Sequence, residues 1–210
     1  VWSEFGNSNP RGKGARMNLV PMVLVNGSNG ERSYDLYSRL LRDRIVMLSG
    51  EIDEQVAALV VSQLLFLQAE DPKADIHLYV NSPGGSVVDG LAIVDSMELS
   101  SCAVNTYAVG QCASMGCVVL AAGSAGKRHA LPSSRMMLHQ VAARTQGPVE
   151  DMRRSVKEAE RLNDLLAEKL AASTGRSLKK IKADMDRDFF LSASEAVRYG
   201  LIDQVLSKKQ

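Results

Sequence analysis

The stretch Gly110-Gln111-Cys112-Ala113-Ser114-Met115-Gly116-Cys117 joins two apolar runs of this 210-residue chain. The run before it, 103–109, is partly β-branched, and the run after it, 118–122, is rich in small apolar residues. This order predicts a strand, a tight turn and a buried helix, with Ser114 at or near the start of the helix. A hydroxyl is therefore expected at one edge of a sheet.

A serine at the start of a helix has two interpretations. Serine is a preferred N-cap, because its oxygen accepts a hydrogen bond from an otherwise unpaired helical N–H group. It can also be a nucleophile, because the helix start presents N–H groups and a positive dipole to a nearby oxyanion. For an isolated serine the cap is the commoner role, so the rest of the chain must decide for Ser114.

The composition argues against several classes of protein. Apolar residues make up 45% and charged residues 23%, which is ordinary for a globular chain of one domain, with or without a small appendage. A net charge of +1 gives no basic footprint for nucleic acid, and no run approaches the roughly 20 apolar residues that span a bilayer. The odd number of cysteines argues against a disulfide framework and for a reducing compartment.

The beginning of the chain differs from the rest. Residues 1–17 show no periodicity and are interpreted as a disordered leader or a cloning remnant. Residues 18–32 contain an apolar arm and a loop of flexible composition at 26–30. Ser33 is expected to cap a short helix through Leu41. The remaining domain, 33–210, shows no internal repeat.

Strands and helices alternate along this domain, which predicts an α/β or α+β fold with parallel strands. Helix 149–172 is the longest, and it carries one apolar stripe. The expected strands are 44–48, 76–80, 103–109, 127–131, 135–138, 189–191 and 201–206, and the expected helices are 54–69, 86–97, 114–122, 149–172, 177–185 and 193–199.

Two of these strands end in polar, glycine-rich turns, at Asn81-Ser82-Pro83-Gly84-Gly85 and at 110–114. Ligands of parallel sheets bind outside the carboxyl ends of the strands. Gly85 has no side chain in the way, so its N–H group could approach a substrate oxygen. The alternative is that the segment is simply a turn.

A serine nucleophile needs a base, and the chain has three histidines. His77 lies within a strand and is interpreted as structural, and His129 has no acid near it in the sequence. His139 ends the strand 135–138 and emerges at a sheet edge, as Ser114 does. An imidazole is the usual base for serine, and an acid then orients it.

The candidate acids are Asp184, Asp186, Asp188, Asp203 and several carboxylates on helix surfaces. Asp188, directly before a strand, is the best placed, but the pattern alone does not decide.

From about residue 18 to residue 206 the chain resembles the ClpP family, the proteolytic subunits of Clp proteases. The motifs that carry the resemblance occur in the family's order. They are Leu19-Val20-Pro21-Met22-Val23, Gly30-Glu31-Arg32-Ser33-Tyr34-Asp35, Tyr79-Val80-Asn81-Ser82-Pro83-Gly84-Gly85, Gly110-Gln111-Cys112-Ala113-Ser114-Met115-Gly116, Met137-Leu138-His139-Gln140 and Asp186-Arg187-Asp188-Phe189-Phe190-Leu191-Ser192.

The resemblance implies a serine endopeptidase. Ser114 matches the family's nucleophile, His139 its general base and acid, and Asp188 the partner that orients the histidine. The backbone N–H groups of Gly85 and Met115 match the family's oxyanion hole. No cofactor or metal is expected on this chain, and it contains no nucleotide-binding G-x-x-x-x-G-K-[ST] motif.

The resemblance also implies a fold and an assembly. The expected fold is the ClpP/crotonase-like spiral of repeated β-β-α units, with a protruding handle helix at about 149–172 and an axial loop at 18–32. Two stacked heptameric rings of this chain are expected, with ion pairs between rings at Asp186 and Arg187. An AAA+ unfoldase of the Clp family would use ATP to deliver unfolded polypeptides. The expected location is the bacterial cytoplasm, or the stroma or matrix of an organelle.

The chain departs from the family's pattern in two places. Residues 141–144 replace a proline and a glycine pair in the segment that aligns the substrate. His77 and His129 replace aromatic residues near the pocket that docks the unfoldase. Cys112 and Cys117 flank the nucleophile and are interpreted as small buried hydrophobes.

Three other functions remain open but less well supported. A catalytically silent, structural ring subunit would have lost a member of the triad. A crotonase-type acyl-CoA enzyme would place acids at the site in place of the pair Ser114 and His139. A membrane-bound signal-peptide peptidase with a Ser-Lys pair would need a membrane segment.

Overall fold

The computed structural model describes residues 20–27 and 30–207. The chain divides into two compact units, Val1–Arg39 and Leu40–Gln210. The predicted leader at 1–17 lies outside the described residues.

The first unit contains an antiparallel pair of strands, β1 (Met22–Gly27) and β2 (Gly30–Asp35), in which Met22 lies opposite Asp35. Both strands extend into the segment 26–30, which the composition predicted to be a loop. The prediction that Ser33 caps a helix is wrong, because Ser33 pairs with Leu24 inside the hairpin. The helix α1 (Leu36–Arg42) starts later, and the Asp35 carboxylate accepts a hydrogen bond from the Ser38 N–H at 3.0 Å.

The second unit is built on a seven-stranded, mostly parallel sheet. Its order is β3 (Ile45–Ser49), β4 (Ile76–Ser82), β5 (Val104–Ala113), β6 (Arg128–Ala130) and β9 (Gln204–Val205). Off this path, β7 (Arg135–Leu138) pairs in parallel with β5 and antiparallel with β8 (Phe189–Ser192). The arrangement confirms the predicted α/β class and is consistent with the spiral fold that the resemblance implies.

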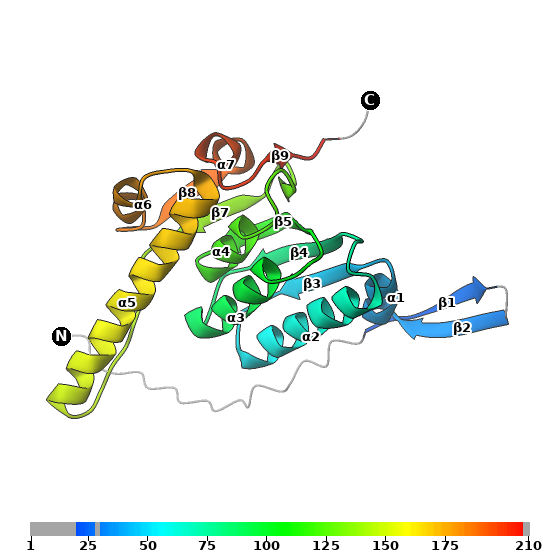
Figure 1. Ribbon diagram of the computed structural model, residues 1–210, viewed down its shortest axis with the longest axis horizontal. Coiled ribbons are helices and arrows are strands. Elements are labelled where there is room, and N and C mark those ends of the chain that lie inside the picture. The colour runs from blue at the N-terminus through cyan, green and yellow to red at the C-terminus, as the bar shows by residue number, and fades with distance from the viewer. Residues whose placement is uncertain (1–19, 28–29, 208–210) are drawn as a thin grey trace, which may run out of the picture. The chain divides into compact units, whose positions relative to one another are not determined.

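The helices α2 (Glu54–Glu70), α3 (Val87–Glu98) and α4 (Met115–Ala121) lie side by side against this sheet (Figure 1). The long helix α5 (Val149–Thr174) packs against α4 and α6 (Leu178–Asp184), and its N-terminal part protrudes (Figure 1). The last helix, α7 (Ala193–Tyr199), begins with a capping box between Ser192 and Glu195. None of the helices within the described ranges combines the length and apolar character needed to cross a bilayer.

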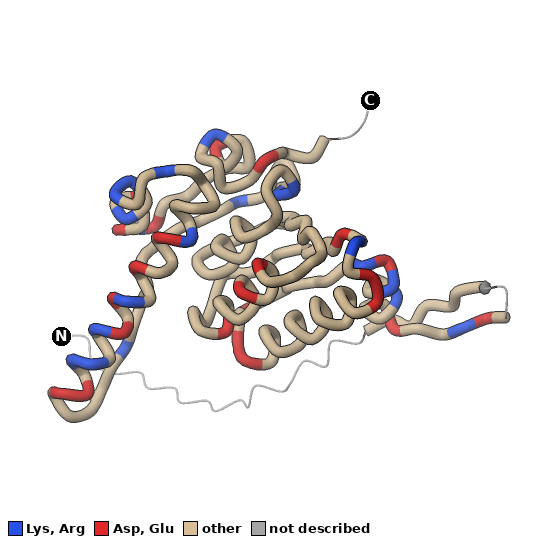
Figure 2. The backbone as a smooth tube through the Cα atoms, viewed as in Figure 1, with Lys and Arg blue, Asp and Glu red and all other residues tan. Residues whose placement is uncertain are grey.

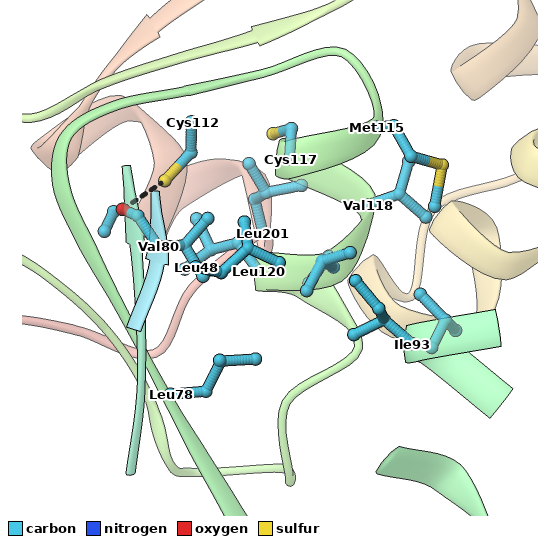
Figure 3. Packing of buried hydrophobic residues seen from close by; sticks show 14 of the residues in the cluster. Leu48, Leu78, Val80, Ile93, Cys112, Met115, Cys117, Val118, Leu120 and Leu201 are labelled. Atoms are coloured by element: carbon cyan, nitrogen blue, oxygen red, sulfur yellow. Dashed lines mark hydrogen bonds between the residues drawn. The ribbon is translucent and has the colours of Figure 1, made fainter. Parts of the chain in front are cut away.

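Helix α4 lies at the centre of the hydrophobic core. All of its residues are buried, and Leu120 belongs to the same hydrophobic cluster as Leu48, Leu78 and Ile93 (Figure 3). Burying side chains of this size stabilises the fold by about 1.5–3 kcal/mol each. The residue that precedes α4, Ser114, is therefore attached to one of the most firmly packed elements of the unit.

Strand β5 is longer than predicted. It does not stop at residue 109 but continues through Gly110, which has a φ of 76°, to Ala113. Before this kink β5 pairs with β6, and after it Gln111–Ala113 pairs with β7. The predicted final strand 201–206 is also wrong in extent, because only Gln204 and Val205 pair with β6.

Candidate active site

Ser114 occupies a strained turn between β5 and α4. Its φ of 54° and ψ of −126° are unusual for a residue with a side chain, and such a conformation costs on the order of 1–3 kcal/mol. The backbone is held there because the Ser114 N–H donates to the Met137 carbonyl at 2.8 Å. The hydroxyl makes no cap hydrogen bond, so the N-cap interpretation of this side chain is wrong.

The Ser114 hydroxyl instead meets His139. The distance between Ser114 Oγ and His139 Nε2 is 2.8 Å, which is a full hydrogen bond. The sheet explains the encounter, because Ala113 lies opposite Met137 in the parallel pairing of β5 and β7. Both strands therefore deliver the residues that follow them to the same edge, as expected from the sequence.

Asp188 lies next to His139 on the side of the imidazole away from Ser114. Leu138 lies opposite Phe189 in the antiparallel pair of β7 and β8, so His139 and Asp188 follow as the next pair. Asp188 Oδ1 lies 3.5 Å from His139 Nδ1, and the Asp188 side chain is 59% exposed. This separation exceeds the 2.7–2.9 Å or so that is typical of a charge-assisted hydrogen bond.

The other candidate acids are engaged elsewhere. The Asp203 carboxylate accepts hydrogen bonds from the Arg128 guanidinium at 2.6 and 3.0 Å, and these bonds lower the pKa of Asp203. Asp184 accepts from the Tyr199 hydroxyl at 2.7 Å, and the Asp186 carboxylate lies 3.8 Å from the Arg187 guanidinium. Asp188 is thus the acid that the geometry selects, and the signal that selects it is a strand pairing between residues distant in the sequence.

Gly85 and Met115, whose N–H groups the resemblance assigns to an oxyanion hole, both line the cavity that contains Ser114. Met115 is the first residue of α4, so its N–H has no acceptor within the helix. Gly85 pairs with Ile52 in a bridge that uses the Ser86 N–H and the Gly84 carbonyl, both at 2.8 Å. The Gly85 N–H therefore points away from Ile52. A Cβ atom at Gly85 would lie 2.2 Å from the Ile52 carbonyl oxygen, so this position requires glycine.

The groups converge on one cavity of about 160 Å³, lined by Gly85, Ser114, Met115 and His139. The rest of its wall is mainly apolar, with Gln140 as a polar member beside Val87, Val118, Leu138, Val141, Ala142, Leu166, Leu170 and Met185. A groove that shares Val87, Val141 and Ala142 continues toward α5. The segment 141–146 forms no strand in this chain, and the Val141 N–H donates to the Asn163 side chain at 2.9 Å.

The two cysteines near Ser114 in the sequence are buried and point to no chemistry of their own. Cys112 and Cys117 lie in the hydrophobic core, and the Cys112 thiol donates to the Val80 carbonyl at 3.2 Å (Figure 3). Burial raises the pKa of Cys112 to about 12 and that of Cys117 well above its ordinary value. Both thiols therefore stay protonated at neutral pH, which confirms their interpretation as small hydrophobes.

The remaining two histidines, on β4 and β6, flank Tyr107 of the intervening strand β5. His77 Nδ1 is 2.8 Å from the Tyr107 hydroxyl, and the rings of Tyr107 and His129 stack at 4.9 Å between centroids. Tyr79 stacks on Tyr107 from β4 at 4.5 Å. Within residues 20–27 and 30–207, no group of three or more His, Cys, Asp or Glu side chains is arranged to hold a metal ion.

Comparison with known proteins adds one finding. A protein-family model described as Clp protease matches residues 28–209. The match covers most of the chain and contains every residue of the cavity described above.

Proposed function

Because the chain belongs to the Clp protease family and is a Clp-type peptidase, we propose that it is a serine endopeptidase with Ser114 as its nucleophile. The observation that carries this proposal is the 2.8 Å hydrogen bond between Ser114 and His139 at a strained turn between strand and helix. A similar strained turn exposes the nucleophilic serine of α/β-hydrolases.

The first half of the proposed reaction forms an acyl-enzyme. Ser114 Oγ attacks the peptide carbonyl while His139 Nε2 takes its proton. The N–H groups of Gly85 and Met115 stabilise the negative charge that develops on the carbonyl oxygen, an effect worth about 10²–10³ in rate for each donor. His139 then gives the proton to the leaving amine.

The second half releases the acyl group to water. His139 removes a proton from the water molecule, which attacks the acyl carbon, and Ser114 leaves with the proton restored. Asp188, at the opposite side of the imidazole, keeps the ring in its working orientation and stabilises the imidazolium. Its exposed carboxylate is expected to approach His139 more closely when a substrate excludes water.

The apolar wall of the cavity supports a preference for cleavage beside apolar side chains. Val118, Leu166 and Met185 line the space next to Ser114, where a charged side chain would lose its hydration without gaining a partner. Unfolded polypeptides expose such side chains, so they are the proposed substrates.

The proposed assembly is a pair of stacked heptameric rings. Val149 and Val156 on the protruding part of α5 are 62% and 48% exposed. Figure 2 shows basic and acidic residues along the same part of the helix. An apolar stripe of this kind is stabilised when a second copy covers it.

We further propose that an AAA+ unfoldase feeds the barrel and hydrolyses ATP. The predicted compartment remains the bacterial cytoplasm or an organelle stroma or matrix.

The test is peptidase activity on short fluorogenic peptides together with labelling by a fluorophosphonate. The wild-type chain should be labelled at Ser114 and should hydrolyse the peptides, whereas Ser114→Ala should do neither. Peptidase activity that survives in Ser114→Ala would contradict the mechanism. Absence of both labelling and hydrolysis in the wild type would favour the silent ring subunit.

A further inference from the structure

The position of Asp188 is not fixed by its own side chain. The carboxylate is 59% exposed, and its recorded ionic contact within the described residues is the one to His139 at 3.5 Å. The pairing of β7 with β8 ends at Leu138 and Phe189, so residues 186–188 lie just beyond the ladder. The location of the carboxylate therefore depends on what holds the backbone of this short segment.

A side chain on the opposite segment supplies that restraint. Gln140 Nε2 donates a hydrogen bond to the Asp186 carbonyl at 2.9 Å. Gln140 directly follows His139, and Asp186 lies two residues before Asp188. The pair formed by His139 and Asp188 is thus enclosed between the end of the strand ladder on one side and the Gln140 bond on the other.

We infer that Gln140 is a positioning residue that holds Asp188 against His139 through the Asp186 carbonyl. The inference rests on the proposed function. A neutral carboxamide suits the task, because it donates to the carbonyl without competing as a charge for the Asp188 carboxylate. Glutamate at this position would have the same shape but no N–H donor, and it would repel both Asp186 and Asp188.

The experiment is a double-mutant cycle between position 140 and position 188. Gln140→Ala and Gln140→Glu should each lower kcat and the rate of Ser114 labelling by about two- to tenfold, the effect of losing one neutral hydrogen bond. KM should stay within about twofold. In the Asp188→Asn background, which retains the Ser114 and His139 pair, Gln140→Ala should have no further effect on the labelling rate.

A matched control is Gln146→Ala, which removes an exposed glutamine from the neighbouring loop and should behave as wild type. Two results would overturn the inference. One is a wild-type kcat in Gln140→Ala. The other is that Gln140→Ala lowers the labelling rate by the same factor in the wild-type and in the Asp188→Asn background. The second result would mean that Gln140 acts through the cavity wall or through stability. Failure of the proposed function is distinguishable, because the wild type would then not be labelled at Ser114.

Discussion

Ser114 and Ser177 show how backbone conformation separates two roles of one residue type. Both precede a helix. Ser177 has extended backbone, with φ of −64° and ψ of 143°, and its hydroxyl accepts from the Lys180 N–H. Ser114 has a φ of 54° and makes no such bond, so its hydroxyl points to His139. The sequence signal is the same in both places, and the strained turn decides which serine is available for chemistry.

Alanine at these two serines should have opposite effects. Ser114→Ala should abolish activity, by a factor on the order of 10⁶ in kcat, with little change in stability. Ser177→Ala should keep activity but lose about 0.5–2 kcal/mol of unfolding free energy, because a helix cap is lost. Urea unfolding and peptide hydrolysis measured on both variants check this. A stability loss in Ser114→Ala as large as in Ser177→Ala would restore the cap interpretation.

Gly85→Ala should inactivate the chain by displacing the N–H group that we propose as an oxyanion donor. The added Cβ would lie 2.2 Å from the Ile52 carbonyl oxygen, so the turn must shift. Loss of one donor is expected to lower kcat by about 10²–10³ with a smaller change in KM. Gly126→Ala is the control, because Gly126 also has positive φ, 79°, but open space around it. Equal losses in the two variants would assign the effect to backbone strain alone.

At the scale of elements, local signals predicted the helices well. The helix over 193–199 has the predicted bounds, because a capping box at Ser192 starts it and Gly200, with a φ of 88°, ends it. What the sequence could not show is the pairing of β7 with two partners. That pairing extends β5 beyond Gly110 and brings Asp188 to His139. Strand partners are set by the packing of segments that are distant in the sequence. The sequence pattern alone therefore left several acids as candidate partners of His139, and the family resemblance singled out Asp188.

The ring stack that includes His77, Tyr107 and His129, across β4, β5 and β6, should make the free energy of unfolding depend on pH. Burial lowers the pKa of His77 and of His129 below the ordinary value of 6.5, against the opposing charges of Asp75 and Asp203. At acidic pH the unfolded chain therefore binds more protons than the folded chain does. The stabilising contribution of neutral imidazoles is complete above pH 6.5 and declines as the pH falls below it.

His129→Phe keeps the ring that stacks on Tyr107 but removes this titration. Urea unfolding at about pH 7.5 and about pH 5.5, at one protein concentration, should show a smaller loss of stability in the variant than in the wild type. An equal loss in both chains would mean that His129 contributes nothing to the pH dependence.

At the scale of the whole molecule, the protruding part of α5 is the feature that a monomer leaves unexplained. Its buried residues, Leu166, Ala167 and Leu170, all lie in the C-terminal half of the helix. The sequence predicted both the helix and its apolar stripe. It could not show which part of the stripe the same chain covers, because that depends on where α4 and α6 pack.

Val156→Glu should weaken the proposed assembly, because it places a charge in the apolar stripe that a second copy is proposed to cover. Sedimentation velocity should show a shift from the large species of the wild type to smaller ones. Val156→Leu, which keeps the stripe apolar, should sediment as the wild type does. A Val156→Glu chain that still forms the wild-type species would locate the contact elsewhere.

The double pairing of β7 also has a consequence for how the chain is made. Translation delivers Ser114 and His139 first, then the whole of α5 and α6, and only afterwards Asp188 and β8. Until β8 emerges from the ribosome, one side of β7 has no partner and nothing orients the imidazole. On the proposed mechanism, a nascent chain therefore carries Ser114 and His139 before Asp188 can orient the imidazole, and it becomes a competent peptidase only after β8 has been synthesised.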